Sequence, residues 1–69
     1  IRVNGIAPGV VEWPVGADPE FQARYIARTP LKRAGTAIEA AQCAAWLAIE
    51  ASFMTGVILR LDGGRWLMT

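Results

Sequence analysis

The sequence contains no histidine and only one cysteine, Cys43. Histidine and cysteine supply most zinc ligands in proteins, so almost nothing is available for a zinc site and we expect no metal centre. A single cysteine cannot close a disulfide within the chain, which fits a reduced, cytoplasmic protein. Charged residues make up 19% of the chain and the net charge is +1, so composition offers no electrostatic basis for binding nucleic acid or a membrane surface. No apolar run reaches the ~18 residues of a membrane span.

Apolar side chains are what the sequence has in excess. Hydrophobic residues make up 54% of only 69 residues. A chain of this size buries only about 60% of its unfolded surface when it folds. We therefore expect further chain or partner subunits to cover the remaining apolar surface. The chain also opens on an apolar run without an initiator methionine, and we expect it to be the C-terminal part of a larger protein.

Two apolar segments predict β-strands. Residues 2–7 show little alternation of polar and apolar positions, which is typical of a strand buried on both faces of a parallel sheet. Pro8-Gly9 ends this segment, and residues 10–17 are expected to form a loop. Residues 57–61 have high β-propensity and predict a second strand, which Asp62-Gly63-Gly64 ends.

Capping residues predict two helices between these strands. Asp18-Pro19-Glu20 is a helix-start signal, and the first helix is expected to end near Arg28. Thr36 and Glu39 have the spacing of a capping box, which predicts a second helix that runs to about Glu50. The order strand, loop, two helices, strand predicts an α/β fold whose two strands are parallel and joined by a right-handed crossover.

The helix predicted over 37–50 has two contrasting faces. One face carries small side chains that allow close approach to a neighbouring element: Ala37, Ala41, Ala44 and Ala48. The other face is polar apart from Trp46. A tryptophan on a polar face indicates either cover by chain beyond this segment or contact with another subunit.

Three motifs together resemble the short-chain dehydrogenase/reductase family, in the order and spacing of that family. The motifs are Arg-Val-Asn-Gly-Ile-Ala-Pro-Gly at 2–9, Pro-Leu-Lys-Arg-Ala-Gly-Thr at 30–36, and Phe-Met-Thr-Gly at 53–56 with Leu-Asp-Gly-Gly at 61–64. The resemblance covers essentially the whole chain and corresponds to the last two strands of the family's sheet with the helices between them. Residues 8–14 and 62–67 are most similar to bacterial pteridine reductases.

The resemblance implies a Rossmann-type doubly wound parallel sheet. Residues 1–69 would be the C-terminal part of one such domain, whose N-terminal cofactor-binding and catalytic part is absent from the segment. The implied activity is NADP(H)-dependent hydride transfer to a planar pterin-like or carbonyl substrate, with NAD(H) not excluded. The family's Ser, Tyr and Lys set is missing here, because Tyr25 is followed four residues later by Thr29. We therefore predict no catalytic residue in this segment and no activity from it alone. The rival hypothesis is an inactive truncated remnant that acts only as a structural or interaction module.

The resemblance also implies site residues. Backbone groups of Val10 and Val11 would bind the nicotinamide carboxamide of the cofactor, in a loop whose shape Pro8 and Gly9 set. The alternative for Pro8 and Gly9 is a simple turn after a strand. Trp13 is the candidate substrate-binding residue, a wall beside a flat substrate. Its alternative role is a hydrophobic clasp that holds the loop to the rest of the molecule.

The implied partners are a small-molecule substrate and further copies of the chain. In the family, the last strand and the long helix before it form a subunit interface, which implies a homotetramer through the 37–50 helix and the final strand. Docking of the same surfaces within one chain is the alternative. The identity of the substrate and the choice between NADPH and NADH stay open.

Overall fold

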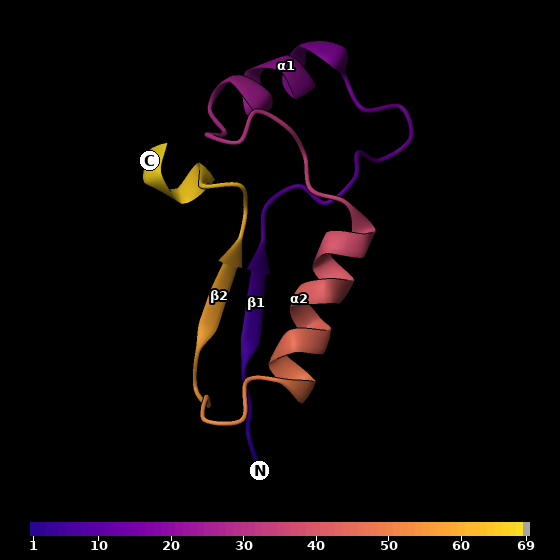
Figure 1. The fold of residues 1–69 in the computed structure, drawn as a ribbon. Coiled ribbons are helices and arrows are strands. Elements are labelled where there is room, and N and C mark those ends of the chain that lie inside the picture. Colours follow the sequence, from indigo (N-terminus) through magenta and orange to yellow (C-terminus); the bar gives the residue numbers. More distant parts are fainter. Residues whose placement is uncertain (69) are drawn as a thin grey trace.

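The computed structural model describes residues 1–68, and its two strands lie side by side (Figure 1). The elements, in chain order, are β1 (Gly5–Pro8), α1 (Pro19–Ala27), α2 (Ala37–Ile49), β2 (Ile58–Leu61) and the short 3-10 helix η1 (Arg65–Met68). Figure 1 shows α2 alongside the strand pair, and α1 and η1 beyond the carboxyl ends of the strands. The predicted order of elements is confirmed.

The two strands are parallel, as predicted. Gly5 is paired with Ile58 and Pro8 with Leu61, and the ladder is continued by the Gly9 N–H, which donates to the Leu61 carbonyl at 2.9 Å. Parallel neighbours require a crossover connection, and α1 and α2 lie within it. The carboxyl ends of both strands therefore meet at the same edge.

The first strand begins at Gly5 rather than at the predicted residue 2, and side chains bond several backbone groups just before it. Asn4 donates its Nδ2 to the Met54 carbonyl and accepts from the Val57 N–H, both at 3.0 Å. The Val3 N–H donates to Thr55 Oγ1 at 3.1 Å. Asn4 thus satisfies backbone groups just before the start of β1.

Each helix begins at the predicted cap. Asp18 Oδ1 accepts from the Glu20 N–H at 3.0 Å, with proline in the first turn of α1. Thr36 and Glu39 form both bonds of the capping box at the start of α2. At the other end of α2, the Arg2 guanidinium donates to the carbonyls of Leu47, Ala48 and Ala51 at 2.8–3.0 Å. A cation at this end satisfies orphan carbonyls and complements the helix dipole.

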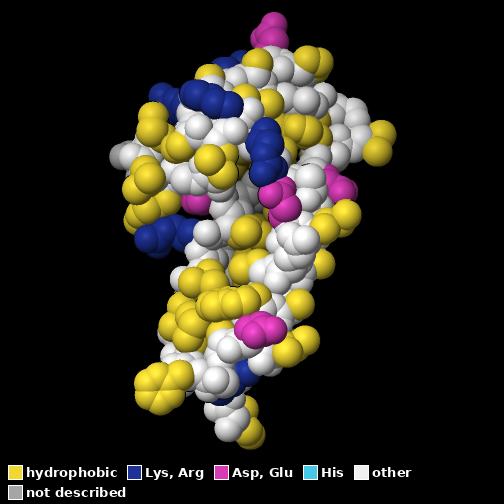
Figure 2. Space-filling view, in the orientation of Figure 1, with side chains coloured by type: hydrophobic (Ala, Val, Ile, Leu, Met, Phe, Trp, Pro, Cys, Tyr) yellow, Lys and Arg dark blue, Asp and Glu magenta, His cyan; other side chains and the backbone are white. Residues whose placement is uncertain are grey.

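The core within residues 1–68 is small. Leu47 and Ala51 are its buried apolar side chains, at 7% and 6% exposure, and Thr29 is also buried. Ala44 and Ala48 line a hollow beside β1 with Leu47, although both alanines are exposed. Figure 2 shows hydrophobic side chains over much of the visible surface, in agreement with the predicted excess of apolar surface. No helix among the described residues is both long enough and apolar enough to cross a bilayer.

Candidate functional site

The predicted site loop leaves the carboxyl end of β1 and is pinned to the segment before α2. The Glu12 N–H donates to the Gly35 carbonyl at 3.0 Å, and the Gly35 N–H donates to the Val10 carbonyl at 2.9 Å. Ligands of open α/β sheets bind outside the carboxyl ends of the strands. The loop therefore occupies the edge of the sheet where a ligand is expected.

The space around Gly9 is too small for a side chain. A Cβ atom there would lie 2.6 Å from the Tyr25 hydroxyl, 3.0 Å from Asp62 Cβ and 3.1 Å from Asp62 Cα. The Tyr25 hydroxyl accepts a hydrogen bond from the Val10 N–H at 3.1 Å. These contacts join β1, α1 and the end of β2 around one glycine, which a simple turn after a strand would not need.

The backbone groups of the two valines differ in their partners. The N–H and carbonyl of Val10 are both engaged, with Tyr25 and Gly35 respectively. The N–H and carbonyl of Val11 take part in no hydrogen bond among residues 1–68. Glu12, the next residue, has a φ of 64°, a left-handed conformation that non-glycine residues seldom adopt. Such conformations concentrate at ligand sites.

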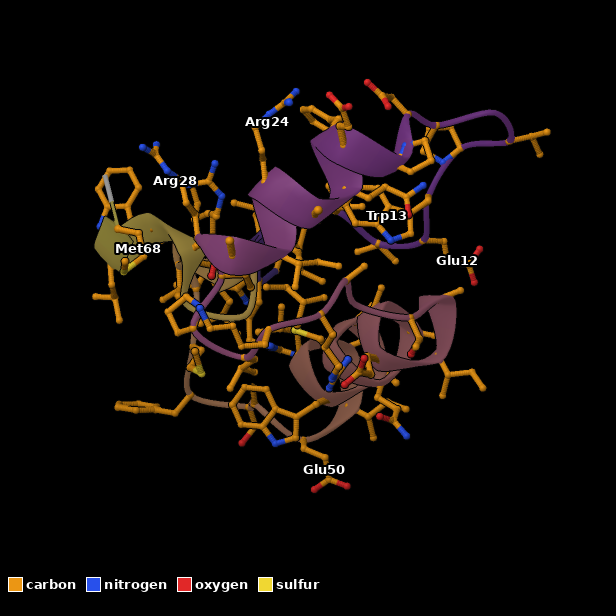
Figure 3. All side chains as sticks on the ribbon, turned by 90° about the horizontal axis from the view of Figure 1, so that it is seen from above. Glu12, Trp13, Arg24, Arg28, Glu50 and Met68 are labelled. Carbon is orange, nitrogen blue, oxygen red and sulfur yellow. The ribbon has the colours of Figure 1, made fainter. Side chains whose placement is uncertain are left out.

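Trp13 lies against α1, as Figure 3 shows, whereas Glu12 points away from the loop. The Trp13 ring makes edge contacts with Phe21 and Tyr25, with centroid distances of 6.3 and 5.7 Å. The half-buried indole thus makes the contacts that the clasp alternative predicts. Its role in substrate binding stays a prediction.

A hollow of about 90 Å³ opens beside the loop, with Val10, Tyr25 and Asp62 in its lining. Arg33 and Glu39 also line it, and they form a two-pronged ion pair with both N–O distances 2.7 Å. The bond from Arg33, followed by that from the Thr36 backbone, lowers the pKa of Glu39 to about 2. Glu39 therefore stays ionised at neutral pH and is unsuited to proton transfer there.

Asp62, Gly63 and Gly64 form the turn expected after the second strand. The φ angles of the two glycines are 63° and 87°, which only glycine adopts freely. Asp62 accepts from the N–H groups of Gly64 and Trp66 at 3.0 and 3.1 Å and so starts η1.

The sequence analysis missed one contact of the loop, the hydrogen bond between the Tyr25 hydroxyl and the Val10 N–H. The two residues lie 15 positions apart and no local pattern connects them. Catalytic residues are predicted to be absent, and the sequence contains no Tyr-x-x-x-Lys. Among residues 1–68, no cluster of three or more His, Cys, Asp or Glu residues could hold a metal ion.

The fold and the loop define a small α/β unit that matches Rossmann-like reductases. A sequence model of the family described as enoyl-(acyl carrier protein) reductase matches residues 1–65. A short-chain dehydrogenase from Bacillus anthracis superimposes with a TM-score of 0.83 at 45% identity, over 96% of this chain and 27% of that one. A 3-oxoacyl-[acyl-carrier protein] reductase from Brucella melitensis gives 0.85 at 41% identity, over 91% and 25%.

Curated relatives agree. A probable 2,4-dienoyl-CoA reductase of Bacillus subtilis is 45% identical, over 97% of this chain and 29% of that protein. A 3beta-hydroxysteroid dehydrogenase of Eggerthella lenta is 44% identical, over 93% and 26%. The chain belongs to the short-chain dehydrogenase/reductase family. It spans less than a third of the length of these two relatives.

Proposed function

We propose that this chain forms the nicotinamide-side wall and the substrate loop of an NADP(H)-dependent reductase, with NAD(H) accommodated by the same groups. The observation that carries the proposal is the pair of unengaged backbone groups at Val11, in a loop that Gly9 and Tyr25 shape at the carboxyl end of β1. The family to which the chain belongs uses nicotinamide cofactors, which supports the assignment.

The chemistry of the carboxamide fits Val11. A carboxamide has an NH₂ group that donates and an oxygen that accepts, and a residue with a free carbonyl and a free N–H can meet both. Val10 shapes the loop through its bonds to Tyr25 and Gly35, and Pro8 ends the strand before it. The bound cofactor supplies the hydride. This chain fixes the position of the ring, and such positioning accounts for a large part of enzymatic rate enhancement.

The proton-transfer groups belong, in this proposal, to chain outside the segment. Within residues 1–68 the ion pair of Glu39 and Arg33 is a structural contact, and the Tyr25 hydroxyl accepts a backbone bond. The segment alone is therefore expected to be inactive, and the full-length enzyme active.

The proposed substrate is a carbonyl compound or a planar pterin-like molecule, with Trp13 as one wall of its site. The substrates in the names of relatives are diverse, and several are thioesters or anions. They include a dienoyl-CoA, a 3-oxoacyl-[acyl-carrier-protein], a cis-4-hydroxycyclohexanecarboxylate and a 4-formylbenzenesulfonate. This range favours a carbonyl substrate over a pterin.

We further propose a cytoplasmic homotetramer that covers apolar side chains of α2 and β2. Trp46, Ile49 and Ile58 are 46%, 75% and 70% exposed in the described structure. Such side chains are the usual material of subunit interfaces. Light scattering of the complete protein tests this state, and a monomer would contradict it.

The test of the proposed function is a kinetic and binding comparison on the complete protein that carries this chain. NADPH oxidation is expected with simple ketones or 3-oxoacyl thioesters, and dihydropterins are tested in parallel as the alternative substrates.

The binding test uses the nicotinic acid analogue of the cofactor. This analogue carries a carboxylate in place of the carboxamide, and a carboxylate cannot donate to the Val11 carbonyl. Its affinity is expected to be about tenfold or more below that of NADP⁺, because an unpaired buried polar group costs about 1–3 kcal/mol. Equal affinity would contradict the proposed contact. Absence of turnover with every substrate would favour the structural module.

A further inference from the structure

Three arginines line a third hollow on the outer side of α1, larger than the hollow beside the loop. Arg24 lies in the last turn of α1, Arg28 is the C-cap residue that follows this helix, and Arg65 begins η1. They line a space of about 400 Å³ together with Phe21, Tyr25 and Ala27. Figure 3 shows Arg24 and Arg28 extending from the same side of α1, and Figure 2 shows Lys and Arg side chains gathered over its C-terminal half.

The charges of this basic hollow are poorly compensated within the described chain. Glu20 forms an ion pair with Arg24 at 3.9 Å, and both side chains are largely exposed, so the pair is weak. No ion pair joins Arg28 or Arg65 to a carboxylate of residues 1–68. The carboxyl end of the α1 dipole favours cations nearby but supplies only a partial negative charge.

Arg65 is held in place and yet retains an unused donor. Its guanidinium lies over the Tyr25 ring, 4.9 Å from the centroid. Its Nε is buried and has no hydrogen-bond partner among the described residues. Buried polar atoms are normally bonded, so this Nε is a donor that remains available to an acceptor. Arginine matches phosphate, sulfonate and carboxylate groups through paired, charge-assisted hydrogen bonds.

Tyr25 lies between this basic hollow and the loop that follows β1. Its ring lies beneath Arg65, and its hydroxyl accepts from the Val10 N–H. Tyr25 lines both the hollow beside Val10 and the basic hollow. A molecule that reacts beside the loop and extends along Tyr25 would bring its far end to Arg24, Arg28 and Arg65.

We infer that the basic hollow binds an oxyanion, a phosphate or a carboxylate, carried by the substrate at the end remote from the reacting carbon. This inference rests on the proposed reductase function for the place of the reacting carbon. It adds a specificity site that the nicotinamide contact does not involve.

The test uses pairs of substrates that differ only at the remote end. Acetoacetyl-4′-phosphopantetheine is compared with acetoacetyl-pantetheine, and 4-formylbenzoate with 4-methylbenzaldehyde, all with NADPH and the complete enzyme. The anionic member of at least one pair is expected to have a kcat/KM about tenfold to a hundredfold higher, chiefly through KM, because hydrogen bonds between charged groups are the strong ones. The first pair identifies a long phosphate-bearing arm and the second a small organic acid.

Variants assign the preference to these arginines. The quantity compared is the ratio of kcat/KM for the anionic substrate to kcat/KM for its neutral counterpart. Arg28→Gln and Arg24→Gln are each expected to lower this ratio, and the double variant to bring it close to one. Arg60→Gln is the matched control, because Arg60 lies over Trp66 at 4.6 Å and is not in the lining, yet its loss changes the net charge equally. If Arg60→Gln lowers the ratio as much as Arg28→Gln does, the preference comes from the net charge of the protein and not from the basic hollow, which would overturn the inference. No preference in either pair, or an unchanged preference in Arg28→Gln, would overturn the inference.

A binding measurement separates this inference from the proposed function. Calorimetric titration with 4′-phosphopantetheine needs no turnover. Binding that Arg28→Gln weakens and Arg60→Gln preserves supports the hollow even if no carbonyl substrate reacts. For this probe, no binding, or binding equal in all variants, contradicts a phosphate site; loss of turnover with intact binding contradicts only the reductase proposal.

Discussion

Replacing Gly9 by alanine is the perturbation whose result the structure determines most closely. The added methyl group would lie 2.6 Å from the Tyr25 hydroxyl and 3.0 Å from Asp62 Cβ. The hydroxyl can move only by leaving the Val10 N–H, and Asp62 is fixed by the bonds it accepts from the turn after β2. Overpacking of this kind costs about 1–3 kcal/mol, and the lost hydrogen bond adds about 0.5–1.5 kcal/mol. We expect Gly9→Ala to lower the free energy of unfolding by roughly 2–4 kcal/mol.

The same substitution is expected to damage function beyond its effect on stability. Displacement of the loop moves Val11, and misplacement of a bound group by about 1 Å can lower a rate by about a hundredfold. The assay is kcat/KM for NADPH with the complete enzyme, beside urea unfolding. Gly5→Ala is the matched control on the same strand, because its Cβ would meet Ile58 Cγ1 at an ordinary 3.6 Å. Adding Tyr25→Phe to Gly9→Ala should restore part of the stability. A Gly9→Ala protein that behaves like the Gly5→Ala control would refute the close approach.

Three further substitutions test the loop and the cap of α2. Glu12→Gly should raise stability by about 0.5–1 kcal/mol in urea unfolding, because it removes the strain of a φ of 64° at a smaller entropic cost; a less stable variant would contradict this. Trp13→Ala should lose about 1–3 kcal/mol with the two aromatic contacts if the residue is a clasp, whereas a raised KM at unchanged stability would assign it to the substrate. The lowered folded-state pKa of Glu39 means that its stabilisation is complete above pH 4.5 and is lost as the pH falls through about 2. Glu39→Gln should therefore reduce the acid-induced loss of stability in that interval, and an unchanged profile would show that the pair with Arg33 does not stabilise the fold.

The parts of the fold that were predictable are those with local causes. Asp18 and the pair Thr36 and Glu39 set the starts of both helices within four residues of sequence, so the caps were readable. The parallel pairing followed from two apolar segments separated by a helical crossover. The predicted end of the second strand at Asp62-Gly63-Gly64 is confirmed, because the turn there depends on neighbouring residues alone.

The parts that were not predictable depend on contacts between distant positions. Arg2 reaches the carbonyls of Leu47 in α2 and of Ala51 just after it, 45 and 49 residues away, and nothing local distinguishes it from a solvated arginine. The bond from Val10 to Tyr25, and the meeting of Arg65 with α1, likewise arise only when the strand ends come together. Trp13 was proposed as a wall of the substrate site, and its contacts with α1 became visible only in three dimensions.

The central claim is that Val11 holds the carboxamide of the nicotinamide ring. The most direct measurement is a crystal structure of the complete protein with NADP⁺. It should place the carboxamide oxygen about 2.7–3.2 Å from the Val11 nitrogen, and the carboxamide nitrogen at a similar distance from the Val11 oxygen. A nicotinamide ring bound elsewhere, with both Val11 groups facing water or other protein, would contradict it.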